Sequence, residues 1–178
     1  ILDMALCMRI PGMTIFAPSS AQELDTMLQA ALHLDGPSAI RYPKGAARHV
    51  GPDSVGSGLS ARRVREGDGS ACIIGVGRML AAAEQAADEL ALSGIQATVW
   101  DPRVVKPLDP ALIADASRHE VVVVVEDGVR TGGAGSAVLA AIEDLEPSRM
   151  PRVRTLGVPD RYLAHAKPDV ILARIGLD

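Results

Sequence analysis

Aromatic side chains are almost missing from this chain of 178 residues, in which Phe, Tyr and Trp together make up 2%. A folded core must therefore be built from Val, Leu, Ile, Ala and Met. The apolar share of 48% is nevertheless normal for a globular protein and too high for a disordered one. An aliphatic core of this kind suits helices packed on a parallel sheet, whose strands are apolar on both faces.

Other scarce features argue against several classes of function. The two cysteines, Cys7 and Cys72, lack the spacing of metal ligands, so we expect free thiols in a reducing cytosol. No apolar run approaches the roughly 20 residues that span a bilayer. The net charge of −4 gives no electrostatic reason to expect nucleic acid or an anionic membrane as a partner. The histidines show no HxH or HExxH spacing and no nucleophile elbow occurs, which disfavours metal-dependent and triad hydrolases.

The first 44 residues predict an incomplete α/β unit. Ser20 and Glu23 form a capping box at the start of its second helix, and Pro43 ends its second strand. The expected elements are a helix over 2–9, a strand over 13–17, a helix from 21 onward and a strand over 39–42. Two strands and two helices are too few to close a core. We therefore expect residues 1–44 to be the tail of a larger domain, and the opening Ile1-Leu2-Asp3-Met4 to come from the middle of a longer chain.

The remaining residues predict a linker and a complete domain. Residues 45–58 are rich in glycine, proline and small polar residues and have no periodicity, which is typical of a linker. From residue 59 to 178, strands and helices alternate. The expected strands are 59–65, 71–76, 95–100, 121–125 and 152–156, and the expected helices are 79–92, 110 onward, 136–145 and 169–174. This alternation predicts a mostly parallel α/β sheet of about five strands with right-handed crossovers.

Two features follow the strand of five valines. The run Gly132-Gly133-Ala134-Gly135 precedes a helix, a context that can bind phosphate, but Val138 stands at the third glycine position of the dinucleotide fingerprint. A tight turn with close helix–sheet packing is therefore favoured. Glu126 and Asp127 lie at the carboxyl end of the same strand, where they could bind a metal, transfer protons or cap the following loop. Their role stays open, with capping favoured.

Cations gather at two predicted strand ends. Arg41 and Lys44 flank a turn forced by Pro43 and Gly45, where a guanidinium fork and a compact ammonium could hold phosphate oxygens or face solvent. Arg103 and Lys106, in the run 101–107, present the same two alternatives.

The motifs occur in an order that resembles the 1-deoxy-D-xylulose-5-phosphate synthase family, within the transketolase-like thiamine-diphosphate enzymes. The segments matching the end of that family's pyrimidine-binding domain are Asp3, Arg9-Ile10-Pro11-Gly12-Met13, Ala17-Pro18-Ser19 and Asp35 to Gly45. The segments matching its C-terminal domain are Gly75-Val76-Gly77, Asp101 to Asp109, Val125 to Gly128, Gly132 to Ser136, Leu156 to Asp160 and Gly176-Leu177-Asp178.

This resemblance implies a transferase that condenses pyruvate with glyceraldehyde 3-phosphate and releases carbon dioxide. The product enters non-mevalonate isoprenoid synthesis and supplies thiamine and pyridoxal precursors. Thiamine diphosphate and Mg²⁺ would be bound by parts of the enzyme that precede this chain, because the family's Gly-Asp-Gly loop and cofactor glutamate do not occur in it. A homodimer in the bacterial cytoplasm is implied, and the chain alone is expected to be inactive, with no catalytic, cofactor or metal residue of its own.

The resemblance assigns one functional position to the chain. Lys44 matches the family's basic residue near the acceptor phosphate, and Arg41 is a weaker candidate beside it. Two alternatives remain: a transketolase or a pyruvate dehydrogenase E1 β-chain relative, and a non-catalytic binding or assembly module built on the C-terminal domain.

Overall fold

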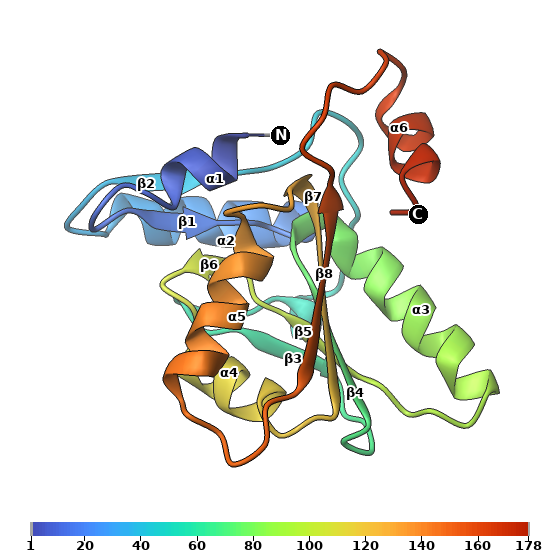
Figure 1. Ribbon diagram of the computed structural model, residues 1–178. Helices are drawn as coiled ribbons and strands as arrows, with labels where there is room; N and C mark the ends of the chain where they lie inside the picture. Colours follow the sequence, from blue (N-terminus) through green and yellow to red (C-terminus); the bar gives the residue numbers. More distant parts are fainter. Residues whose placement is uncertain (1, 178) are drawn as a thin grey trace.

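A computed structural model describes residues 2–177, so Ile1 of the opening segment and Asp178 of the closing motif lie outside the described residues. The chain forms two sheets (Figure 1). The larger sheet has five strands and belongs to the second half of the chain. The smaller sheet has three strands, two from the N-terminal segment and one from the C-terminal domain.

The five-stranded sheet has the order β3-β5-β4-β7-β8. Its strands are β3 (Arg62–Arg65), β4 (Ala71–Gly75), β5 (Thr98–Asp101), β7 (Val121–Val129) and β8 (Arg152–Val158). All neighbours pair in parallel except β3, which pairs antiparallel with β5 at the edge. The prediction of a mostly parallel sheet of five strands is confirmed.

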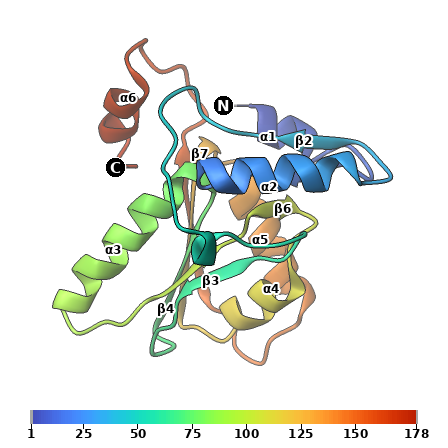
Figure 2. The ribbon, with the colours of Figure 1, turned by 180° about the vertical axis from the view of Figure 1, so that it is seen from behind.

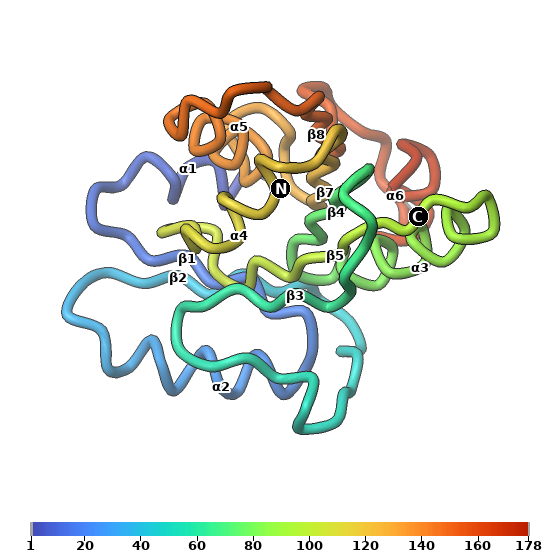
Figure 3. Tube along the Cα trace, turned by 90° about the horizontal axis from the view of Figure 1, so that it is seen from below, coloured from blue at the N-terminus to red at the C-terminus, as the bar shows by residue number. Residues whose placement is uncertain are grey.

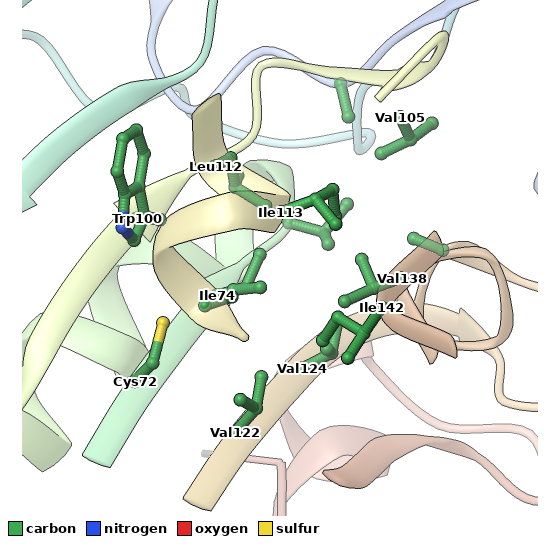
Figure 4. Close-up of a cluster of buried hydrophobic side chains, with 14 of the residues drawn as sticks. Cys72, Ile74, Trp100, Val105, Leu112, Ile113, Val122, Val124, Val138 and Ile142 are labelled. Atoms are coloured by element: carbon green, nitrogen blue, oxygen red, sulfur yellow. The ribbon is translucent and has the colours of Figure 1, made fainter. Parts of the chain in front are cut away.

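Helices cover the two faces of this sheet unequally. One face packs against α4 (Pro110–Ala116) and α5 (Ala134–Asp144), while the other carries α3 (Leu80–Leu92) and, at one end, α6 (Pro168–Arg174). Figure 4 shows the first of these interfaces, in which Val122 and Val124 meet Val138 and Ile142. Short 3₁₀ turns occur at Pro52–Ser54 and Gly77–Met79. The expected aliphatic core is therefore present.

The N-terminal segment forms a layer of its own, seen from both sides in Figures 1 and 2. It contains α1 (Asp3–Cys7), β1 (Thr14–Phe16), α2 (Ala21–Leu32) and β2 (Ser38–Ile40). Its sheet has the order β2-β1-β6, with β1 parallel to β2 and antiparallel to β6 (Val104–Lys106). The third strand thus comes from the C-terminal part of the chain.

This strand β6 was not expected from the sequence, which suggested only a strand end there. Other boundaries also differ: β7 continues to Val129, and β5 begins at Thr98 rather than at Ile95. The extra length of β7 arises because Val129 pairs with Val158 of β8 after a register shift. The predicted linker, residues 45–58, contains one 3₁₀ turn and no strand.

Candidate functional site

The N-terminal layer lies across the carboxyl ends of the parallel strands (Figures 1 and 3). Backbone hydrogen bonds fix it there, because Ala17 N donates to Arg103 O at 2.8 Å next to the β1–β6 pairing. Residues 41–45, hereafter the strand-end turn, follow β2 at this junction. The carboxyl edge of a parallel sheet is where α/β domains place their sites, so this junction is the candidate functional site.

Arg41 is committed to partners within the chain. Its Nε donates to Asp3 Oδ2 at 2.9 Å, its Nη1 donates to Asp127 Oδ1, and its Nη2 donates to the carbonyl oxygen of Asp127 at 3.2 Å. Burial alone would lower the pKa of Arg41, but the carboxylates of Asp127 and Asp3 raise it above its usual value. Arg41 therefore connects α1, β2 and the carboxyl end of β7, and Asp127 has an ion-pair role.

Lys44 has the opposite character. Its side chain is exposed at the strand-end turn, and no hydrogen bond or ion pair engages it within residues 2–177. The neighbouring Tyr42 is 61% exposed. Of the two cations predicted for the site, Lys44 is thus free to meet a ligand, whereas Arg41 would have to leave two carboxylates.

Glu126 caps the glycine run. Its carboxylate accepts hydrogen bonds from Ala134 N at 3.1 Å and from Gly135 N at 2.9 Å, at the first turn of α5. Burial raises the pKa of this carboxyl group, while the two amides oppose the shift. The carboxylate occupies the place where a phosphate would bind. The capping interpretation of Glu126 is confirmed.

The glycines of this run provide space for close packing. A Cβ on Gly133 would lie 2.3 Å from Glu126 Oε2, and a Cβ on Gly135 would lie 2.1 Å from Thr155 Cγ2. Any side chain at these positions would displace the carboxylate or β8. The structural interpretation of Gly132 to Gly135, a tight turn with close helix–sheet packing, is confirmed.

Arg103 and Glu23 form a buried ion pair at the junction. Arg103 Nε lies 2.9 and 2.8 Å from the two carboxylate oxygens of Glu23, and both side chains are fully buried. Nη1 of Arg103 donates to three carbonyl oxygens, those of Ser57 and Gly58 at the end of the linker and that of Ser60 just after it. This pair therefore joins α2, the linker and the C-terminal domain, and sequence reasoning missed the role of Arg103.

The backbone around this ion pair is adapted to it. Arg103 has a φ of 56°, a left-handed conformation that is uncommon for a residue with a side chain. A Cβ on Gly56 would lie 2.4 Å from Arg103 Nε, so only glycine fits beside the guanidinium. Gly56 N in turn donates to Glu23 Oε1 at 2.6 Å. The linker is thus packed against the ion pair at Gly56.

Two further polar side chains, those of Asp101 and Lys106, strengthen the junction. Asp101 Oδ2 accepts from Ser19 Oγ at 2.6 Å, and Asp101 Oδ1 accepts from Arg103 N at 3.0 Å. Burial raises the pKa of Asp101 to about 6, with the neighbouring Glu23 adding to the effect. Lys106 Nζ donates to the carbonyl oxygens of Met8 and Ile10 at 2.9 and 2.6 Å, just after α1. The cations of the run 101–107 are therefore structural.

No group of three or more His, Cys, Asp or Glu side chains within residues 2–177 could hold a metal ion. Glu126 fills the glycine-rich start of α5. Both cysteines are free, and burial raises the pKa of Cys72 to about 12, whereas Cys7 is half-buried. No helix within this range is long and apolar enough to cross a bilayer.

The fold and the junction define a transketolase-type C-terminal domain joined to the end of a pyrimidine-binding domain. The chain belongs to the transketolase family: residues 59–178 match the transketolase C-terminal domain, and residues 1–50 match the transketolase pyrimidine binding domain. The family is one of thiamine-diphosphate-dependent transferases.

Among curated proteins, the chain is similar to 1-deoxy-D-xylulose-5-phosphate synthases. It is 42% identical over 181 residues to the synthase of Thermobifida fusca (strain YX), covering 99% of this chain and 28% of the relative. It is 43% identical over 185 residues to that of Anaeromyxobacter dehalogenans (strain 2CP-1), covering 99% and 29%. The chain thus spans less than a third of the length of these relatives.

Solved structures agree with this assignment. A split-gene transketolase, described as an inactive β4 tetramer, has a TM-score of 0.89 at 31% identity, covering 99% of this chain and 57% of that one. Transketolase from Campylobacter jejuni has a TM-score of 0.77 at 18% identity, covering 99% and 26%. The second likeness shows the fold alone.

Proposed function

We propose that this chain forms the C-terminal part of a 1-deoxy-D-xylulose-5-phosphate synthase. The whole enzyme would condense pyruvate with glyceraldehyde 3-phosphate and release carbon dioxide. The observation that carries the proposal is identity of 42–43% to such synthases across 99% of the chain. Thiamine diphosphate and Mg²⁺ would be bound by other parts of the enzyme, since no metal-binding cluster occurs within residues 2–177.

Within this enzyme the chain supplies a scaffold and one direct contact. Lys44 would meet the phosphate of the acceptor substrate, because it is the exposed and unengaged cation of the strand-end turn among the described residues. Arg41 would position the turn through Asp3 and Asp127. We thus assign the phosphate contact to Lys44 and regard Arg41 as a positioning residue.

Lys44→Ala in the full-length enzyme tests this assignment. We expect KM for glyceraldehyde 3-phosphate to rise by about tenfold to a hundredfold, since a charge-assisted phosphate contact contributes about 1.5–3 kcal/mol. KM for pyruvate should change by less than about twofold. Steady-state kinetics with each substrate varied in turn measure both values.

Lys167→Ala is the matched control, because Lys167 is also exposed but precedes α6. It should leave both constants unchanged. Equal effects of Lys44→Ala on the two substrates would reject the phosphate role. If the full-length enzyme used a ketose phosphate donor instead of pyruvate, the synthase assignment itself would fail in favour of a transketolase.

We further propose that the enzyme self-associates and acts in the bacterial cytoplasm. Self-association is supported by the structural relative described as a β4 tetramer, which matches 99% of this chain. The bacterial relatives support the location.

A further inference from the structure

The strand-end turn has few restraints of its own. Arg41 N donates to Phe16 O at 2.9 Å where the turn begins, but residues 42–47 make no backbone hydrogen bond within the described chain. Lys44 lies in the middle of this stretch, and its ammonium group stands on a flexible stem of four carbons. The place of that ammonium group therefore depends on how firmly the start of the turn is fixed, and hence on the side chain of Arg41.

Asp127 supplies two of the three contacts that fix this side chain. Its carboxylate accepts from Nη1 of Arg41, and its carbonyl oxygen accepts from Nη2 at 3.2 Å. Asp3 supplies the third contact, with Nε at 2.9 Å. The side chain of Asp127 is only 10% exposed, against 45% for Asp3, so solvent screens the pair with Asp127 less. Asp127 is therefore the main anchor of Arg41.

The C-terminal domain in turn holds Asp127 in place. Asp127 belongs to β7, between Val125 and Val129, and both of these residues pair with β8. The preceding residue, Glu126, accepts hydrogen bonds from two amides at the start of α5. A carboxylate fixed in one domain thus holds the start of a turn that belongs to the other domain, 86 residues away along the chain.

We propose that Asp127 is a positioning residue for the acceptor substrate, because through Arg41 it holds Lys44 where the ammonium group meets the phosphate. This inference rests on the phosphate contact proposed for Lys44 and adds the residue of the C-terminal domain that controls it. Asp127 itself touches no substrate in this scheme. Its loss weakens binding of the phosphorylated aldehyde and leaves the use of pyruvate unchanged.

The charges at the turn set the direction of the effect. Two carboxylates neutralise the guanidinium of Arg41, so the cation that the turn offers to a ligand is Lys44. Arg41 is a structural link between β7 and the turn, and Asp127 keeps it in that role. Removing the charge of Asp127 therefore loosens the turn and raises KM.

Asp127→Asn in the full-length enzyme tests the proposal. Asparagine keeps the size of the side chain and one oxygen acceptor but removes the charge, so the contact with Arg41 weakens without leaving a cavity. KM for glyceraldehyde 3-phosphate should rise about fivefold, while kcat and KM for pyruvate change by less than about twofold. Steady-state kinetics with each substrate varied in turn measure the three constants.

Arg41→Lys approaches the same link from its other side. Lysine keeps the positive charge but lacks the planar fork that holds Asp3 and both acceptors of Asp127 together. KM for glyceraldehyde 3-phosphate should rise by a similar factor, again without a matching change for pyruvate.

A second background separates positioning from a general structural effect. If Asp127 acts through Lys44, its replacement has little left to disturb once Lys44 is alanine. In that background Asp127→Asn should raise KM for glyceraldehyde 3-phosphate by less than about 1.5-fold, since residues that act as one unit are not additive. Two independent effects would multiply instead.

Asp88→Asn is the matched control, because Asp88 also pairs with an arginine, Arg65, but lies on α3. The three kinetic constants should keep their wild-type values in this variant. Circular dichroism of the full-length enzyme should show every variant folded.

Three results would overturn the proposal: an unchanged or lowered KM for glyceraldehyde 3-phosphate in Asp127→Asn, an equal loss with both substrates, or effects that multiply with Lys44→Ala. A lowered KM would show that Asp127 withholds Arg41 from the phosphate. If Lys44→Ala itself had no effect, the phosphate contact of the proposed function would fail. A large effect of Lys44→Ala with none of Asp127→Asn would reject the positioning role alone.

Discussion

Between β7 and α5 the buried side chains are aliphatic, and Val124 meets Val138 and Ile142 there. At the junction with the N-terminal layer the fully buried side chains include Glu23, Asp101 and Arg103. The first interface depends on the area removed from water, which many aliphatic sequences can supply. The second depends on each buried charged group lying beside a partner that compensates its charge or accepts its hydrogen bonds.

This difference indicates what each interface achieves. A buried ion pair contributes little net stability, because the loss of hydration offsets much of its attraction, but removal of one partner is strongly destabilising. The Glu23–Arg103 pair therefore penalises every other placement of α2 over the domain. Since α2 and the strand-end turn belong to one small sheet layer, the pair also holds the turn in place. Three predictions sharpen the comparison, from the largest effect to the smallest.

Arg103→Ala should have the largest effect. The change leaves the Glu23 carboxylate buried without its cation, so we expect the unfolding free energy to fall by about 3–5 kcal/mol. Urea denaturation followed by circular dichroism measures the loss. Arg63→Ala removes an exposed guanidinium of β3 that lies near Glu66, Asp115 and the ring of Trp100, and it should lower the unfolding free energy by only about 1 kcal/mol.

A second variant separates the two contributions. Arg103→Met with Glu23→Leu removes both charges together, and it should recover much of the stability lost in Arg103→Ala. If the double variant were as unstable as the single one, the uncompensated charge would not be the cause.

Asp101→Asn should change the pH dependence of stability. The folded-state pKa of Asp101 is about 6, above its ordinary value of 3.8, so the folded state binds the proton more tightly than the unfolded state. Its contribution is therefore fully present below pH 4 and is lost as the pH rises through 6, by at most about 3 kcal/mol. Asparagine keeps one oxygen that can accept from the amide of Arg103, and its NH2 group can donate to the hydroxyl oxygen of Ser19.

The measurement is urea denaturation of the wild type and of Asp101→Asn between pH 4 and 7. As the pH rises, the unfolding free energy of the wild type should fall relative to that of the variant. Parallel pH profiles would show that Asp101 does not titrate in this range.

Arg48→Ala should have the smallest effect. Arg48 pairs with Glu84 across the surface between the linker and α3, where its side chain is 42% exposed. An exposed pair contributes about 0.2–1 kcal/mol, and 1 M NaCl should screen it. Thermal unfolding at low and high salt measures the change. A loss comparable with that of Arg103→Ala would mean that surface charge, rather than the buried pair, holds the junction.

Local patterns predicted much of the fold. The valine run specified the central strand, and the capping box of Ser20 and Glu23 gave the start of α2, since Glu23 N donates to Ser20 Oγ at 3.1 Å. What the pattern could not show is that the Glu23 carboxylate turns away from that box to meet Arg103, 80 residues further along the chain. Strand β6 was missed for the same reason, because this strand of three residues, in a segment bounded by Pro102 and Pro107, forms only when β1 lies beside it.

The candidate site shows the same division. Lys44 and Arg41 look alike in sequence, as two cations flanking one turn, and only the structure separates the engaged guanidinium from the exposed ammonium. The sequence by itself determined the alternation of strands and helices, the aliphatic core and the order of family motifs, since these depend on local spacing and composition. The tertiary structure decided which charges are buried, which are paired and which face of the sheet stays open, because each depends on residues that are distant in the chain.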